Sequence, residues 1–198
     1  FTLTITQADQ IAYSAGSISL ATPSLGTFAV SSRSGGTGIG GHDDKMPTAW
    51  EETWGTSLGT GMDLPKGVSS SMNIGWTSPS FGGSSLKIAA APSNDATFNN
   101  DKGVSAAGNA AVQGGMDVLL DINPSFGVDA LAGLNIFAGG SRTNQGTANA
   151  LDRTGDREEA VAGATFAYGP VTVGYQRSIE LTGLETASAV QFYQNNAF

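Results

Sequence analysis

The chain has 198 residues, of which 28 are glycine and 13% are charged, and its formal net charge is −8. About 25% of residues are charged in an ordinary soluble domain, so this composition is poor in charge. The acidic balance argues against a nucleic-acid-binding protein, because phosphate recognition needs clustered lysine and arginine. The sequence contains no cysteine, which excludes disulfides and thiolate metal sites. It also lacks a stretch of about 18 apolar residues, so it predicts no transmembrane helix.

Apolar and polar residues alternate with period two along most of the chain, which predicts strands with one apolar and one polar face. In chain order the alternating segments are 1–6, 17–20, 27–31, 71–77, 85–90, 115–122, 127–138, 160–168 and 171–176. The segment 127–138 is less regular because Leu131 and Phe137 lie on its polar side, but we still expect a strand. We expect about ten strands in all.

The connections between these segments are predicted to alternate in length. Short turns rich in glycine and proline are expected at 23–26, 78–83, 123–126 and 169–170. Long loops are expected at 7–15, 34–67, 92–113, 140–157 and 178–187. Short turns at one end and long loops at the other are typical of outer-membrane barrels. A compact soluble sandwich prefers short connections throughout.

Alternation alone does not say what the apolar face meets, because a soluble sandwich and a membrane barrel give the same pattern. Two features favour the barrel. Aromatic residues near strand ends (Trp76, Phe126, Tyr168 and Tyr175) fall where interfacial girdles lie. The polar face also holds few of the lysine and glutamate residues expected on a solvated surface. In lipid only a closed barrel satisfies the backbone groups of strands.

Three segments resemble the general-diffusion porins of alphaproteobacteria. Residues 156–176 (DREEAVAGATFAYGPVTVGYQ) are similar to a stretch of their barrel wall. Residues 25–30 (LGTFAV) resemble the strand before their long third loop, and residues 42–54 (HDDKMPTAWEETW) resemble that loop. The resemblance is patchy but keeps its order along most of the chain.

The resemblance implies an all-β fold, an antiparallel transmembrane β-barrel of sixteen strands whose third loop folds into the lumen. It further implies a homotrimer in the outer membrane of a Gram-negative bacterium, in contact with lipid and lipopolysaccharide. Sixteen strands with their loops need about 300 residues, so we expect residues 1–198 to be one incomplete barrel domain. A complete ten-stranded barrel is the alternative. Phe198 matches a terminal aromatic, but residues 193–198 lack the expected alternation.

The implied function is a water-filled channel for passive diffusion of ions and small hydrophilic solutes. No enzyme is expected, because His42 stands alone in a glycine-rich acidic loop and no Gly-x-Ser-x-Gly elbow occurs. The glycine-rich residues 35–41 lack a P-loop ending and are expected to be a flexible lead-in to that loop. The alternative is a secreted or surface-exposed soluble β protein, such as an adhesin or fibre domain.

The loop 34–67 is the candidate constriction, because charged residues inside a pore select solutes by sign. Its acidic site candidates are Asp43, Asp44, Glu51 and Glu52. Pro47 can begin a short helix that runs through Trp54. The alternative is a solvated surface loop whose charges keep it soluble.

Arg33 and Lys87 are the basic site candidates, since both continue polar faces of predicted strands. They either face the acidic loop across the lumen or pair locally with Asp117 or Asp121. The remaining arginines considered lie at expected strand ends or in loops: Arg142, Arg153, Arg157 and Arg177.

Calcium is the one cofactor that the sequence brings into question, because Ca²⁺ takes oxygen ligands. The pairs 43–44 and 51–52 supply carboxylates, namely Asp43, Asp44, Glu51 and Glu52. No Asp-x-Asp-x-Asp-Gly loop accompanies them, so the signal for a metal site is weak.

Overall fold

The structure is a computed structural model. It describes residues 2–7, 13–32, 36–45, 67–68, 72–92, 112–123, 128–145, 155–183 and 190–198. All structural statements below concern these residues.

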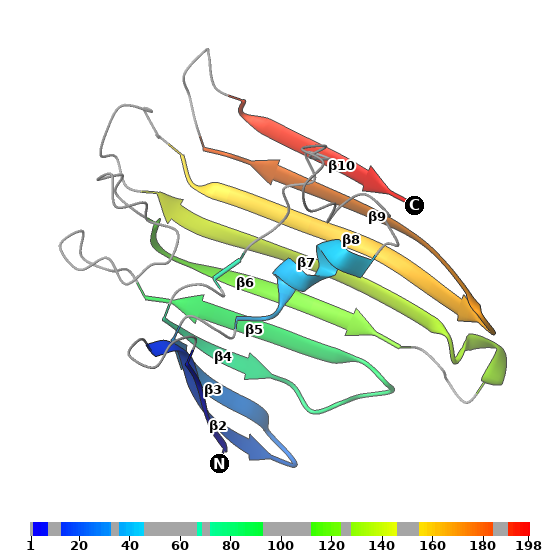
Figure 1. Cartoon of the computed structure of the whole chain (residues 1–198), viewed down its shortest axis with the longest axis horizontal. Helices are drawn as coiled ribbons and strands as arrows, with labels where there is room; N and C mark the ends of the chain where they lie inside the picture. Colours follow the sequence, from blue (N-terminus) through cyan, green and yellow to red (C-terminus); the bar gives the residue numbers. More distant parts are fainter. Residues whose placement is uncertain are drawn as a thin grey trace.

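Ten strands form one antiparallel sheet in which each strand pairs with the next in sequence (Figure 1). The strands are β1 Thr2–Gln7, β2 Tyr13–Thr22, β3 Gly26–Ser32, β4 Asn73–Thr77, β5 Ser85–Ala91, β6 Val112–Ile122, β7 Leu134–Gln145, β8 Arg157–Tyr168, β9 Val171–Leu181 and β10 Phe192–Ala197. Two 3₁₀ helices accompany them, η1 Ile39–Lys45 and η2 Asp129–Leu131. The expected all-β, antiparallel architecture is therefore confirmed.

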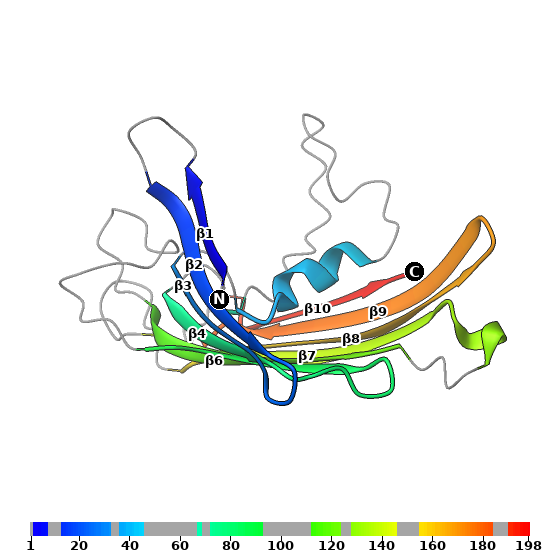
Figure 2. The same cartoon turned by 90° about the horizontal axis from the view of Figure 1, so that it is seen from below.

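The sheet is strongly curved and is not closed (Figure 2). Within the described residues β1 pairs only with β2, and β10 pairs only with β9. In this part of the chain, no helix is long and apolar enough to cross a membrane.

The strand register keeps like residues on the same face. Across β3, β4, β5 and β6, the residues Phe28, Trp76, Ile88 and Val118 are paired in one row. A slip of one residue would move every side chain of a strand to the opposite face, so the alternating pattern itself fixes this register.

The connections follow the expected division by length only in part, because the eleven-residue connection 123–133 between β6 and β7 lies at the same end of the sheet as the short turns (Figure 1). Residues 23–25, 78–84 and 169–170 make short turns at one end, and the connection 33–72 joins β3 to β4 at the other. Gly26 and Gly169 take positive φ values of 83° and 59°, a conformation that favours glycine.

Four details of the sequence prediction were wrong. The expected strand 127–138 begins only at Leu134, because the chain first makes the 3₁₀ turn η2, in which Leu131 N–H donates to Val128 O. The flexible lead-in expected over residues 35–41 overlaps the 3₁₀ helix η1, which begins at Ile39. The C-terminal residues, expected to lack a strand, form β10. Arg142 and Arg177, expected at strand ends or in loops, lie inside β7 and β9, whereas Arg157 begins β8 as expected.

The apolar face of the sheet is exposed, whereas its polar face is buried. The convex face is apolar and open to the surroundings, with Ile74 59%, Met116 55% and Val173 58% exposed. The concave face carries polar residues that are covered, with Asp117 and Gln176 each 1% exposed. Among the described residues, therefore, nothing covers the hydrophobic face, whereas the polar face is covered.

Candidate functional site on the concave face

The segment η1 lies across the concave face of the sheet (Figures 1 and 2). It contacts β6, β8 and β9. Ile39 is 1% exposed and belongs to a small apolar cluster with Phe137, Val161 and Ala197. This cluster holds the start of the β3–β4 connection against the wall of the sheet, because burial of its side chains is favourable.

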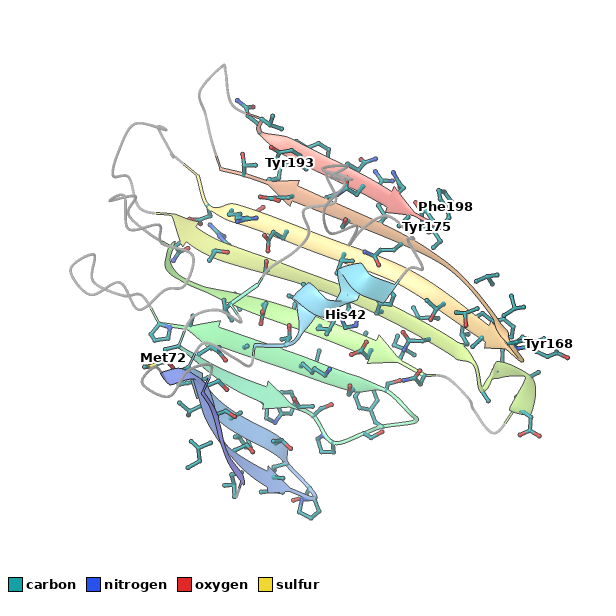
Figure 3. The ribbon with its side chains drawn as sticks, viewed as in Figure 1. His42, Met72, Tyr168, Tyr175, Tyr193 and Phe198 are labelled. Atoms are coloured by element: carbon teal, nitrogen blue, oxygen red, sulfur yellow. The ribbon has the colours of Figure 1, made fainter. Side chains whose placement is uncertain are left out.

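His42 lies on η1, over the concave face of the sheet (Figure 3), and pairs with a carboxylate of β6. Its Nε2 lies 2.8 Å from Asp121 Oδ1 and its Nδ1 lies 3.2 Å from Gly38 O. The ring also meets Phe137 edge-on, with centroids 4.9 Å apart. Lys87 Nζ lies 3.2 Å from the other oxygen, Asp121 Oδ2. Asp121 therefore joins a residue of the connection to a residue of the wall.

The far end of the same connection is anchored by backbone donors. Gly67 N–H donates to Glu159 Oε2 at 3.1 Å, and Val68 N–H donates to Asp117 Oδ2 at 3.0 Å. Gly67 has a φ of +57°, and a Cβ there would collide with Asp117 Oδ2. This position therefore requires glycine both for its backbone conformation and for its contact with the wall.

Asn73 at the start of β4 ties the two ends of the connection together. Its Oδ1 accepts from Gly36 N–H at 3.0 Å, and its Nδ2 donates to Val68 O at 3.3 Å. One buried amide thus bridges the entrance and the exit of the segment between β3 and β4. Three attachments, at residues 36, 42 and 67–68, keep the described residues 36–45 and 67–68 on the concave face.

A row of polar residues crosses the wall beneath these anchors. Asp117, Ser141, Glu159 and Glu180 are register partners on β6, β7, β8 and β9. Ser141 Oγ donates to Glu159 Oε2 at 2.6 Å. Arg157 bridges the last two carboxylates, with 2.8 Å from Nε to Glu159 Oε1 and 2.8 Å from Nη2 to Glu180 Oε1. Burying carboxylates is costly unless they are paired or hydrogen-bonded, and here Arg157 pairs with Glu159 and Glu180 while Val68 N–H donates to Asp117 Oδ2.

The structure tests only part of the site proposed from sequence. Lys87 pairs with Asp121, which is the local pairing considered as the alternative to a partner in the acidic loop. Asp43 and Asp44 lie on η1, but their side chains are not described. Arg33, Glu51, Glu52 and the helix expected over residues 47–54 lie outside the described residues. Within the described residues, no group of three or more His, Cys, Asp or Glu side chains is placed to hold a metal ion. The calcium site stays a prediction.

The sequence argument missed the anchoring role of His42, Asp117 and Glu159. The pattern did contain a signal for the carboxylates, since Asp117 and Asp121 interrupt an otherwise apolar segment on the side that faces away from Met116 and Val118. The sequence pattern contained no such signal for His42, because its partner Asp121 is 79 positions away.

Chemically, the arrangement holds a chain segment across the curved, polar side of a sheet. The described contacts are ion pairs and hydrogen bonds that fix the position of this segment. Comparison with protein-family models, with curated proteins and with solved structures finds no match for this chain.

Proposed function

We propose that the chain forms the wall of an outer-membrane porin, with the β3–β4 connection folded inside as the constriction. The pore passes ions and small hydrophilic solutes by diffusion. The observation that carries the proposal is the inverted burial of the sheet, whose apolar face is open and whose polar face is covered.

The inverted burial has a simple physical explanation in lipid. In water, an exposed apolar face of this extent would be an aggregation site. In a bilayer the same face meets hydrocarbon, and the polar face lines an aqueous lumen. The convex side chains Ile74, Met116 and Val173 then need no protein cover.

Strand length supports the same placement. A strand that crosses a bilayer at a tilt of about 45° needs about 9–11 residues. Five of the ten strands, β2, β6, β7, β8 and β9, have 10 to 12 residues and are long enough to cross, whereas the other five have 5 to 7 as described. The mean strand of a soluble protein is only about 5–6 residues.

The attachments of residues 36–45 and 67–68 support the constriction. A connection held on the concave face narrows whatever space that face encloses. The acidic residues expected in this connection, together with Lys87 and Arg157 on the wall, would set the electric field that acts on solutes in the pore. Closure of the sheet into a barrel, with sixteen strands and three subunits, belongs to this proposal.

The direct test is fractionation followed by electrical recording. Expressed with an export signal in a Gram-negative host, the protein should pellet with the outer membrane and require detergent for extraction. In a planar bilayer the purified protein should give stepwise, ohmic conductance. A protein that stays soluble without detergent and gives no conductance would overturn the proposal in favour of a secreted or surface-exposed β protein.

The constriction has a separate test within that recording. Glu51→Gln and Arg33→Ala should each change the ratio of cation to anion permeability, because both are proposed to line the narrow part. Glu158→Gln on the convex face is the matched control for loss of a carboxylate and should leave the ratio unchanged. Equal ratios in all variants would remove the constriction from the proposal.

A further inference from the structure

The convex face is hollowed where small residues of β7 and β8 lie between larger residues of β6 and β9. One row of register partners across these four strands is Val118, Gly140, Ala160 and Ile179. The hollow at this row has a volume of about 350 Å³, and its apolar lining consists of Met116, Val118, Gly140, Ala160, Ile179 and Leu181. Ligand pockets have volumes of about 300–1,000 Å³ and mostly apolar linings, so this hollow is large enough to hold part of a ligand.

The hollow has a charged end. Arg142 and Glu158 follow Gly140 and Ala160 on the same two strands and complete its lining there. This is the end of the sheet that carries the connection between β3 and β4, where an interface with water is expected (Figure 1). An apolar hollow that begins at this interface and continues toward the middle of the sheet has the layout of a binding site for an amphipathic molecule.

A second hollow, of about 320 Å³, lies toward β5 and includes Ala90 and Asn144 in its lining. It shares Met116 and Arg142 with the first hollow. The guanidinium of Arg142 therefore stands between two hollows of similar size, at the end of the sheet where water is expected.

Arg142 has donors to spare for a ligand. Its side chain is 60% exposed, and its Nε and Nη2 lie 2.7 Å and 2.6 Å from Asp156 Oδ2. A guanidinium carries five N–H groups, so this pairing leaves further donors that can reach an acceptor outside the chain. Phosphate oxygens suit them, because arginine binds phosphate through paired N–H groups.

We propose that the two hollows bind acyl chains of one phosphorylated membrane lipid and that Arg142 binds its phosphate. The inference rests on the proposed function, which brings lipid to the convex face. Inside a bilayer the hydrophobic effect does not distinguish one apolar surface from another. Selectivity for this lipid therefore comes from the packing of its chains in the hollows and from the contact between phosphate and guanidinium.

The neighbouring carboxylates decide how the phosphate binds. Asp156 pairs with Arg142, and Glu158 Oε1 lies 3.8 Å from Arg142 Nε. Two carboxylates beside one guanidinium would repel a bare phosphate. Mg²⁺ binds carboxylate and phosphate oxygens together, so the lipid should bind together with a divalent cation.

The test measures the affinity for lipid A, a multi-chain lipid with phosphates on its headgroup, by native mass spectrometry of the detergent-purified protein in Mg²⁺. Gly140→Leu fills the first hollow, and a Cβ added at Gly140 meets only Glu159 O, at 3.4 Å, so the backbone accommodates it. Ala164→Leu is the matched control, because Ala164 lies on the same face of β8 as Ala160 but outside the linings of both hollows. Conductance in a planar bilayer, which neither substitution should change, reports that each variant is folded.

Gly140→Leu should weaken lipid A binding at least about tenfold, and Ala164→Leu by less than about twofold. Arg142→Gln and removal of the phosphates from lipid A should each weaken binding at least about fivefold, and both together no more than either alone, because they remove the same contact. Equal affinities of the two leucine variants, or equal affinities for lipid A with and without its phosphates, would overturn the lipid site. Stepwise conductance would in that case leave the porin proposal standing. Protein that stays soluble without detergent would overturn both proposals.

Discussion

Asp121 should control how firmly the β3–β4 connection stays on the wall, and Asp121→Asn tests this. The wild-type carboxylate meets His42 Nε2 at 2.8 Å and Lys87 Nζ at 3.2 Å. His42 is 5% exposed, so weakening its contact with Asp121 costs about 1–3 kcal/mol. The partly exposed pair with Lys87 contributes about 0–1 kcal/mol. We therefore expect η1 to lose about 2 kcal/mol of local stability.

Hydrogen exchange measures this loss directly. A change of 2 kcal/mol corresponds to about 30-fold faster exchange for amides protected by closure of η1, such as Gly41 N–H. Lys87→Met should accelerate the same amides by less than about fivefold, because its pair is worth at most 1 kcal/mol. A double-mutant cycle with His42→Phe, which keeps a ring against Phe137, isolates the coupling between His42 and Asp121. Unchanged exchange in Asp121→Asn, or an equal effect of Lys87→Met, would refute the anchoring role.

Three further substitutions probe the wall and can be followed by thermal unfolding in detergent. Gly67→Ala should cost at least about 2 kcal/mol more stability than Gly82→Ala. Both glycines have similar positive φ, but only a Cβ at position 67 would meet Asp117 and Ile39 Cγ2, the latter at 2.7 Å. Equal losses of stability would contradict the close contact of Gly67 with the wall. Ile39→Ala should cost about 2–4 kcal/mol through a cavity in the cluster beneath η1, and a loss under 1 kcal/mol would mean that the cluster is loosely packed. Arg157→Leu should cost about 3–5 kcal/mol by removing the cation between two buried carboxylates, whereas a neutral result would show that they are hydrated.

The sequence was enough to predict the sheet because its information is local. Alternation assigns each residue to a face, and the register then follows from matching faces, as in the row through Phe28, Trp76, Ile88 and Val118. Glycine and proline mark the short turns for the same local reason, since Gly26 and Gly169 adopt positive φ. These features depend on neighbours in the chain and can be read from it.

The site depended on contacts that no local pattern encodes. The pairs His42–Asp121 and Gly67–Glu159 join residues 79 and 92 positions apart. The helix η1 forms in a glycine-rich stretch where propensity predicts none, and the apolar contact of Ile39 with the wall supplies its stability. β10 is a further case, because Asn195 and Asn196 are poor strand formers that join the sheet by pairing with Ser178 and Arg177.

The central claim is that the convex face meets lipid, and nitroxide scanning along β6 tests it most directly. Single labels at Met116, Val118 and Leu120 point outward, and labels at Asp117 and Leu119 point to the covered side. In reconstituted membranes, we predict that labels at the outward positions collide often with lipid-dissolved oxygen and rarely with a water-soluble nickel complex. Labels at the positions on the covered side should collide rarely with oxygen, so that oxygen accessibility alternates along β6. Frequent collisions with the nickel complex at Met116 and Val118, or no alternation of period two, would contradict the account.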